Sequence, residues 1–266
     1  MTRLLPTYFL SHGGGPWPWM MKDMPGVFDE LDRSLRAIPK QLDQAPKAIL
    51  VVTGHWIAHE FAVSAHPQPP MIYDYGGFPP ETYTVKYPAP GSPELAERVR
   101  GLLAGAGLPT RLDPDRGFDH GTYTVLVPMF PHANVPVVQL SVQRRFDPEK
   151  HLQVGRALAP LRNEGVLILG SGLSYHNLGS FGPEAIQPSK TFDQWLREAL
   201  QALPEERWKR LTQWSDAPAA RQAHPREDHL VPLMVTVGAA ERDAAERVYH
   251  EDNFFGSWCV SSYRFG

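Results

Sequence analysis

Three histidines of this chain follow short apolar segments, at points where glycine interrupts the apolar pattern. The pairs of segment and histidine are residues 7–11 with His12, 48–52 with His55, and 166–169 with His176. Such continuous apolar runs predict buried parallel strands. Ligands of open α/β sheets bind beyond the carboxyl ends of these strands, so we expect the three imidazoles to meet at one sheet edge. Imidazole is the commonest metal ligand and a usual acid or base near neutral pH.

Two further histidines belong to this group of candidates. His120 lies in the glycine-bounded loop 117–121, ahead of an apolar segment that ends at Met129. His229 is expected in the first turn of a helix that runs from about His224 to Val237. Three histidine ligands with open coordination positions suit Zn(II) or Fe(II), and ligand type alone does not choose between the two metals.

The other histidines are interpreted differently. His224 is either a neighbour of a helix cap or a group that supports the site from behind. The remaining ones lack the strand-end pattern and are expected to face solvent: His59, His66, His132, His151 and His250.

The segment His12–Gly15 also permits a second interpretation. It is similar to the oxyanion-hole loop of lipase-like hydrolases, which accompanies a Gly-x-Ser-x-Gly nucleophile turn. The chain contains no such turn, and the nearest approach, residues 172–176, lacks the closing glycine. The hydrolase hypothesis is therefore disfavoured, and a tight loop that holds His12 at the end of a strand is the better interpretation.

Composition limits the remaining classes of protein. The chain has 266 residues and a net charge of −3, so no broad basic field indicates nucleic acid or an acidic membrane. The single cysteine, Cys259, excludes an intramolecular disulfide and a cysteine-rich metal site. Apolar runs are too short to span a bilayer, and Pro6 interrupts the first one, so we expect a cytoplasmic protein.

The patterning predicts an α/β fold: a single domain, 1–266, with a central largely parallel or mixed β-sheet flanked by helices. Strands are predicted at 7–11, 48–52, 59–65, 135–142, 166–169 and 258–263, with a short extended stretch near 110–112. Helices are predicted at 27–42, 93–106, 150–162, 190–202, 204–214 and 224–237. The Pro/Gly/Tyr-rich residues 67–93 are predicted to form an ordered loop.

Several short motifs, in this order, cover nearly the whole chain. They are Ser11-His12-Gly13, Gly54-His55-Trp56, residues 73–79 (YDYGGFP), 86–93 (KYPAPGSP), 117–121 (GFDHG), 137–141 (VVQLS), His176-Asn177-Leu178 and 224–230 (HPREDHL). With these motifs the chain resembles class III extradiol ring-cleavage dioxygenases of the LigB superfamily, in the DOPA 4,5-dioxygenase-like branch. Each motif alone is weak, but their combination is specific.

The resemblance implies that His12, His55 and His229 are metal ligands. It implies that His176 is the acid/base beside the open coordination positions, and that His120 forms a hydrogen-bonding wall for substrate or dioxygen. In the wider superfamily the third ligand is a glutamate, whereas the DOPA-like branch has histidine, here His229. Whether His176 is instead a fourth ligand stays open.

The implied activity is insertion of both atoms of O2 into a catechol-type substrate, with Fe(II) expected for activity and Zn(II) plausible as a bound metal. The expected partners are the catechol and O2, with no nucleic acid or membrane. A zinc-dependent hydrolase on the same fold and a non-catalytic metal-binding relative are the alternatives. The aromatic residues considered as pocket walls are Trp17, Trp19, Tyr75 and Tyr175. The oligomeric state and the physiological catechol stay open.

Overall fold

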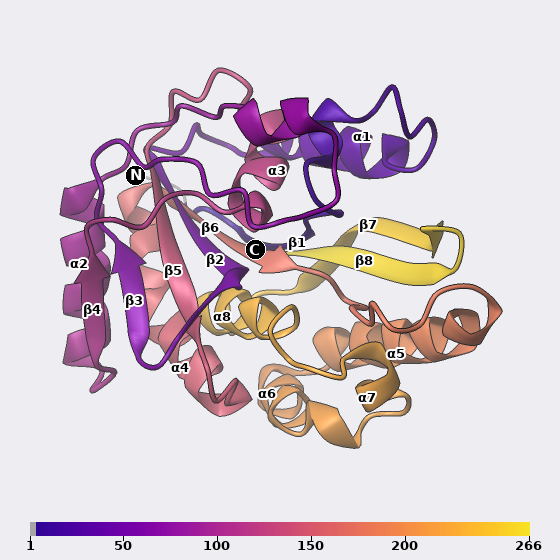
Figure 1. Cartoon of the computed structure of the whole chain (residues 1–266). Helices are drawn as coiled ribbons and strands as arrows, with labels where there is room; N and C mark the ends of the chain where they lie inside the picture. Colours follow the sequence, from indigo (N-terminus) through magenta and orange to yellow (C-terminus); the bar gives the residue numbers. More distant parts are fainter. Residues whose placement is uncertain (1–3) are drawn as a thin grey trace.

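A single eight-stranded sheet organises the chain. The structure is a computed structural model and describes residues 4–266. The strand order is β4-β3-β5-β2-β6-β1-β8-β7 (Figure 1). The strands are β1 (Thr7–Ser11), β2 (Ala48–Ala58), β3 (Phe61–Ser64), β4 (Thr110–Asp113), β5 (Val137–Gln143), β6 (Val166–Gly172), β7 (Ala245–Phe254) and β8 (Trp258–Phe265). First and last strands pair in this sheet, so both ends of the chain contribute to one fold.

The four central strands, β5, β2, β6 and β1, run parallel, so their carboxyl ends lie along one edge. Their residues are almost entirely buried, which explains the continuous apolar runs in the sequence. The outer strands make the sheet mixed, because β3 pairs antiparallel with β5 and β8 pairs antiparallel with β1 and β7. The prediction of an α/β fold with a central mixed sheet is confirmed.

Helices cover both faces of this sheet (Figure 1). Their bounds are α1 (Asp29–Ala37), α2 (Pro93–Gly105), α3 (His120–Met129), α4 (Pro148–Leu158), α5 (Pro183–Gln201), α6 (Pro204–Thr212), α7 (Ala220–Ala223) and α8 (Val231–Ala239). Successive side chains of β2 point to opposite faces: Leu50 packs in a core with α2 and α4, whereas Ile49 packs in a core with α1 and α3. Within residues 4–266, no helix is long and apolar enough to cross a membrane.

Several predicted boundaries were wrong. The helix predicted at 27–42 is α1 followed by a 3₁₀ helix, Ile38–Gln41, because Pro39 cannot continue the α-helical hydrogen bonding. The strand predicted at 48–52 continues to Ala58, and the apolar segment before Met129 is helix α3. Strand β7 was missed, because its mostly polar residues lie at the exposed edge of the sheet.

Candidate active site

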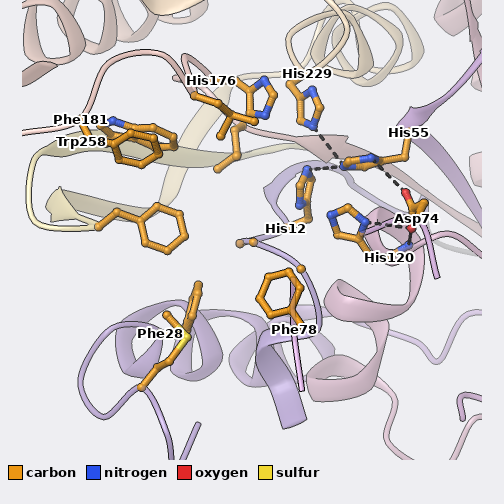
Figure 2. A pocket seen from close by; sticks show the side chains of 17 residues that line it. His12, Phe28, His55, Asp74, Phe78, His120, His176, Phe181, His229 and Trp258 are labelled. Carbon is orange, nitrogen blue, oxygen red and sulfur yellow. Dashed lines mark hydrogen bonds and ion pairs between the residues drawn. The ribbon is translucent and has the colours of Figure 1, made fainter. Parts of the chain in front are cut away.

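Five histidines gather at the carboxyl edge of the parallel strands (Figure 2). Nε2 of His55 lies 3.3 Å from Nε2 of His12 and 3.1 Å from Nε2 of His229. The ring of His120 lies 3.9 Å from that of His55, centroid to centroid, and the ring of His176 stacks on that of His229. The structure therefore brings together all five histidines that the sequence singled out.

The spacing of the three Nε2 atoms suits a metal ion. Two nitrogens bound at about 2.0–2.1 Å and about 90–110° apart would be separated by about 2.8–3.4 Å. Both Nε2 distances from His55 fall in this range. Without a cation or proton between them, adjacent imidazole lone pairs would repel one another, so the donor set fits a divalent metal. Potential ligand nitrogens of His12, His55 and His120 also lie within 4.8 Å of one another. These three histidines are therefore an alternative set of metal ligands.

The backbone explains how His55 and His229 reach this position. His55 lies inside β2 rather than after it, where the pairing of β2 with β5 shifts register between Val52 and Ile57. Such a bulge re-aims side chains beside active sites. His229 lies in the turn before α8, not in its first turn as predicted. Its carbonyl oxygen accepts a hydrogen bond from Leu173 N (3.1 Å), and a Cβ on Gly172 would stand 2.1 Å from that oxygen.

Asp74 joins two of the histidines, a role that was not predicted from the sequence. One carboxylate oxygen lies 3.1 Å from Nδ1 of His55; the other lies 3.0 Å from Nδ1 of His120 and accepts from its backbone N–H at 2.9 Å. A carboxylate accepting from Nδ1–H leaves Nε2 unprotonated on each neutral ring. Asp74 thus directs the Nε2 lone pair of His55 towards His12 and His229. Its only sequence signal was its place in the motif at 73–79.

Burial keeps several of these imidazoles neutral. Desolvation, reinforced by the neighbouring imidazoles, holds the pKa of His12 and of His229 well below the ordinary value. The same causes lower the pKa of His176 to about 4 and lower that of His120. The pKa of Asp74 is also lowered: hydrogen bonds and charge from His120 and His55 outweigh its burial. A neutral imidazole can accept a proton or bind a metal, so this environment suits both tasks.

The other six histidines differ in burial and in role. His224 supports the site from behind: its Nε2 donates to Ser174 O (2.9 Å), and the backbone N–H of His176 donates to the adjacent Ala223 O (2.9 Å). His151 was predicted to face solvent, which is wrong: it is fully buried, donates from Nδ1 to Asp147 O and accepts from Gln143 N. His59, His132 and His250 are exposed, whereas His66 is half-buried.

A cavity of about 410 Å³ opens over the histidines. Its walls are not the aromatic residues proposed from the sequence, since Trp17, Trp19, Tyr75 and Tyr175 are all absent from the lining. Trp17 is fully buried and donates to His12 O at 2.8 Å, so it holds the loop beneath His12. The aromatic lining comes from other parts of the chain: Phe28, Phe78, Phe181, Phe255 and Trp258.

Comparison with known proteins identifies the family of this chain. Residues 6–266 match the family described as the catalytic LigB subunit of aromatic ring-opening dioxygenase. The chain belongs to the LigB family. It is 39% identical to a 4,5-DOPA dioxygenase extradiol of Beta vulgaris, with 97% of this chain and 96% of that protein covered. It is 34% identical to the protein of the same name in Escherichia coli K12, with 98% and 95% covered.

A solved structure shares the fold of this chain. A crystal structure of an uncharacterized protein from Escherichia coli K12 superimposes with a TM-score of 0.79 at 30% identity, covering 98% of this chain and 100% of the other. The predicted family, fold and enzyme class, an aromatic ring-opening dioxygenase of the extradiol type, are therefore confirmed. LigB dioxygenases are non-haem metal enzymes, and His12, His55 and His120 bring potential ligand nitrogens close enough together to hold a metal ion.

Proposed function

We propose that this LigB enzyme opens a catechol-type ring with O2 at a metal held by His12, His55 and His229. The observation that carries the assignment is the convergence of the three Nε2 atoms, 3.1 and 3.3 Å from the central one, at one end of a cavity. The names of the relatives, 4,5-DOPA dioxygenase extradiol, support a catechol as the substrate class.

Fe(II) is the metal we propose for turnover: when bound, it supplies adjacent positions for a diol and O2 and a path for electrons between them. Zn(II) also binds imidazole nitrogen but has no redox chemistry, so it would occupy the site without supporting ring opening. His120 competes with His229 for the third ligand position. We assign the position to His229, because its Nε2 lies 3.1 Å from Nε2 of His55. The ring of His120 instead lies beside the ring of His55, with centroids 3.9 Å apart.

The remaining two histidines handle protons in this proposal. His176 lines the cavity, and its lowered pKa of about 4 keeps it neutral at pH 7. It can therefore accept a proton from a substrate hydroxyl and return it to a developing oxyanion. His120 donates from Nδ1 to Asp74, which leaves Nε2 available to accept a hydrogen bond from substrate. Its backbone N–H to the same carboxylate fixes the ring's position at the start of α3.

The decisive experiment measures oxygen consumption. Anaerobically purified protein is reconstituted with Fe(II), mixed with unsubstituted catechol under air, and followed with an oxygen electrode and by absorbance of the yellow semialdehyde. We expect one O2 consumed per ring opened, and none with the Zn(II)-loaded protein. Activity that persists without O2 would favour a zinc-dependent hydrolase instead. Bound metal with no turnover of any catechol would favour a non-catalytic relative.

A cytoplasmic location and a one-domain organisation over 1–266 remain parts of the proposal. The lone cysteine, Cys259, is buried and forms no disulfide, which is compatible with a reducing compartment. Cell fractionation with an antibody against the chain tests the location.

A further inference from the structure

The cavity over the histidines has a polar end and an apolar end (Figure 2). The histidines and Asp74 form the polar end, and Phe181 and Trp258 lie at the opposite end in the same view. Pockets of about 300–1,000 Å³ hold ligands of several rings or chains. At about 410 Å³, this cavity has room for a diol ring and a substituent that extends away from the histidines.

The apolar end is built from aromatic rings in mutual contact. Phe181 stacks on Trp258 with ring centroids 4.6 Å apart, and Phe255 meets Trp258 edge-on at 5.5 Å. Phe28 continues the series, 5.5 Å from Phe255. The one polar side-chain atom in this wall, Nε1 of Trp258, donates to Ser180 O at 2.9 Å. The wall thus presents carbon surface to the cavity, with its only side-chain N–H already paired.

Charged partners for a substrate are scarce. Among the residues that the structure describes, the lining contains no lysine or arginine. Its single carboxylate, Asp74, already accepts from His55 and His120. A substrate carboxylate buried beside the aromatic wall would lose hydration without gaining a side-chain partner of opposite charge, which is strongly unfavourable.

The rim of the cavity is apolar as well. Leu178 is 66% exposed and Phe181 is 44% exposed, in the segment between β6 and α5 that also carries His176. Large apolar side chains gathered at the mouth of a pocket commonly mark a place that a ligand covers. An apolar substituent reaching the rim would bury both side chains, whereas a charged one would not benefit from them.

On the basis of the proposed catechol cleavage, we infer that the pocket selects catechols whose ring substituent is uncharged and apolar, an alkyl or aryl group. Amino-acid and carboxylate side chains, such as that of DOPA, are disfavoured. The diol end binds beside His12, His55 and His229, and the substituent lies along Phe28, Phe255 and the Phe181–Trp258 pair.

The first test compares catechols that differ only in the substituent. Initial rates of O2 uptake are measured with the Fe(II) enzyme for catechol, 4-ethylcatechol, 4-phenylcatechol, 3,4-dihydroxyphenylacetate, dopamine and DOPA. We expect kcat/KM for 4-ethylcatechol to exceed that for 3,4-dihydroxyphenylacetate and for DOPA by about tenfold or more. Anaerobic titration calorimetry gives the dissociation constants of the same compounds, and we expect the same order.

The second test adds the missing charge. Leu178→Arg places a cation at the rim, and the matched control Leu203→Arg makes the same change at an exposed leucine that does not line the cavity. We expect Leu178→Arg to raise the ratio of kcat/KM for 3,4-dihydroxyphenylacetate over 4-ethylcatechol by about two- to fivefold, the size of a solvent-exposed ion pair. The control should leave the ratio at the wild-type value.

The outcomes separate this inference from the function on which it rests. If no catechol consumes O2, the proposed function is wrong. If catechol is cleaved but DOPA or the carboxylate is preferred over the ethyl compound, the substrate inference alone is overturned. The backbone N–H groups of Gly13–Gly15, which also line the cavity, would then be the candidates for binding the anion.

Discussion

The imidazole of His176 lies flat on that of His229, with ring centroids 3.5 Å apart and planes 12° from parallel. Two rings stacked in this way cannot both direct their nitrogens edge-on to one metal from the same side. His229 faces His55 through Nε2, so in the proposed function His176 lies beside the metal ligands rather than among them. This relationship separates the roles that the two residues have in the proposal.

Metal content and turnover should therefore respond differently to alanine substitutions. His12→Ala, His55→Ala and His229→Ala should each lose Fe(II), measured by elemental analysis of protein desalted after anaerobic loading. His176→Ala should retain about one metal per chain and lose roughly a hundredfold or more in kcat, since a positioned acid/base contributes about 10²–10⁴-fold. His120→Ala is the control for the alternative set of ligands: if it loses the metal and His229→Ala does not, the ligand assignment is wrong.

Asp74→Asn should weaken metal binding without removing a ligand. The asparagine side chain keeps the shape but offers at most one acceptor oxygen, so it cannot accept from Nδ1 of both His55 and His120. Loss of such a carboxylate behind a ligating histidine commonly costs about 10–100-fold in metal affinity. Competition with a chromophoric chelator measures the dissociation constant. Asp113→Asn, in β4, is the control and should bind metal like the wild type.

Gly172→Ala should disturb the site through the backbone. The added Cβ would stand 2.1 Å from the carbonyl oxygen of His229, which forces the turn that carries this histidine away from β6. We expect a lower unfolding midpoint in urea and a loss of metal affinity. The matched control is Gly101→Ala in α2, where an added Cβ meets open space and should raise stability by up to about 1 kcal/mol. Normal metal affinity in Gly172→Ala would refute the close-approach argument.

His151 should make the metal-free protein less stable as the pH falls. Burial lowers its pKa in the folded state from 6.5 to about 4, so the unfolded chain binds the proton more tightly. Its contribution is therefore fully present above pH 6.5 and is lost as the pH falls towards 4. Between pH 7.5 and pH 5.0 this amounts to about 2 kcal/mol of unfolding free energy.

Urea unfolding of metal-free wild type, His151→Gln and His132→Gln at the two pH values tests this expectation. The His151 variant should show a smaller drop in unfolding free energy between pH 7.5 and 5.0, although it starts from a lower stability. The variant at exposed His132 should keep the wild-type drop. Equal drops in all three proteins would show that His151 does not contribute to the pH dependence.

The sequence predicted the parts of the site that local patterns encode. His12 follows an apolar strand and a glycine loop follows it, so its place at the sheet edge was predictable from residues 7–15. His55 was correctly predicted at the same edge, but the predicted strand end before it was wrong. Strand β2 continues past His55, and a bulge turns its side chain towards the site. A bulge depends on pairing with β5, which no local pattern of β2 reveals.

Asp74 and the aromatic wall could not be predicted in the same way. Asp74 lies in irregular chain, and its contacts with His55 and His120 arise only when that chain folds back over the sheet edge. Phe28 and Trp258 are 230 positions apart in the sequence, and each is indistinguishable from a core residue until the cavity between them is seen. Contacts between residues far apart in the sequence, rather than local periodicity, place these side chains at the site.

The irregular segment between β3 and α2 has a consequence for attempts to re-engineer the enzyme. It carries Asp74, which contacts two of the histidines, and Phe78, which lines the cavity only four residues later. A transplant of this segment from a relative would exchange both side chains at once. Metal binding and substrate preference therefore both depend on this one segment. Only point substitutions within it can change one property without the other.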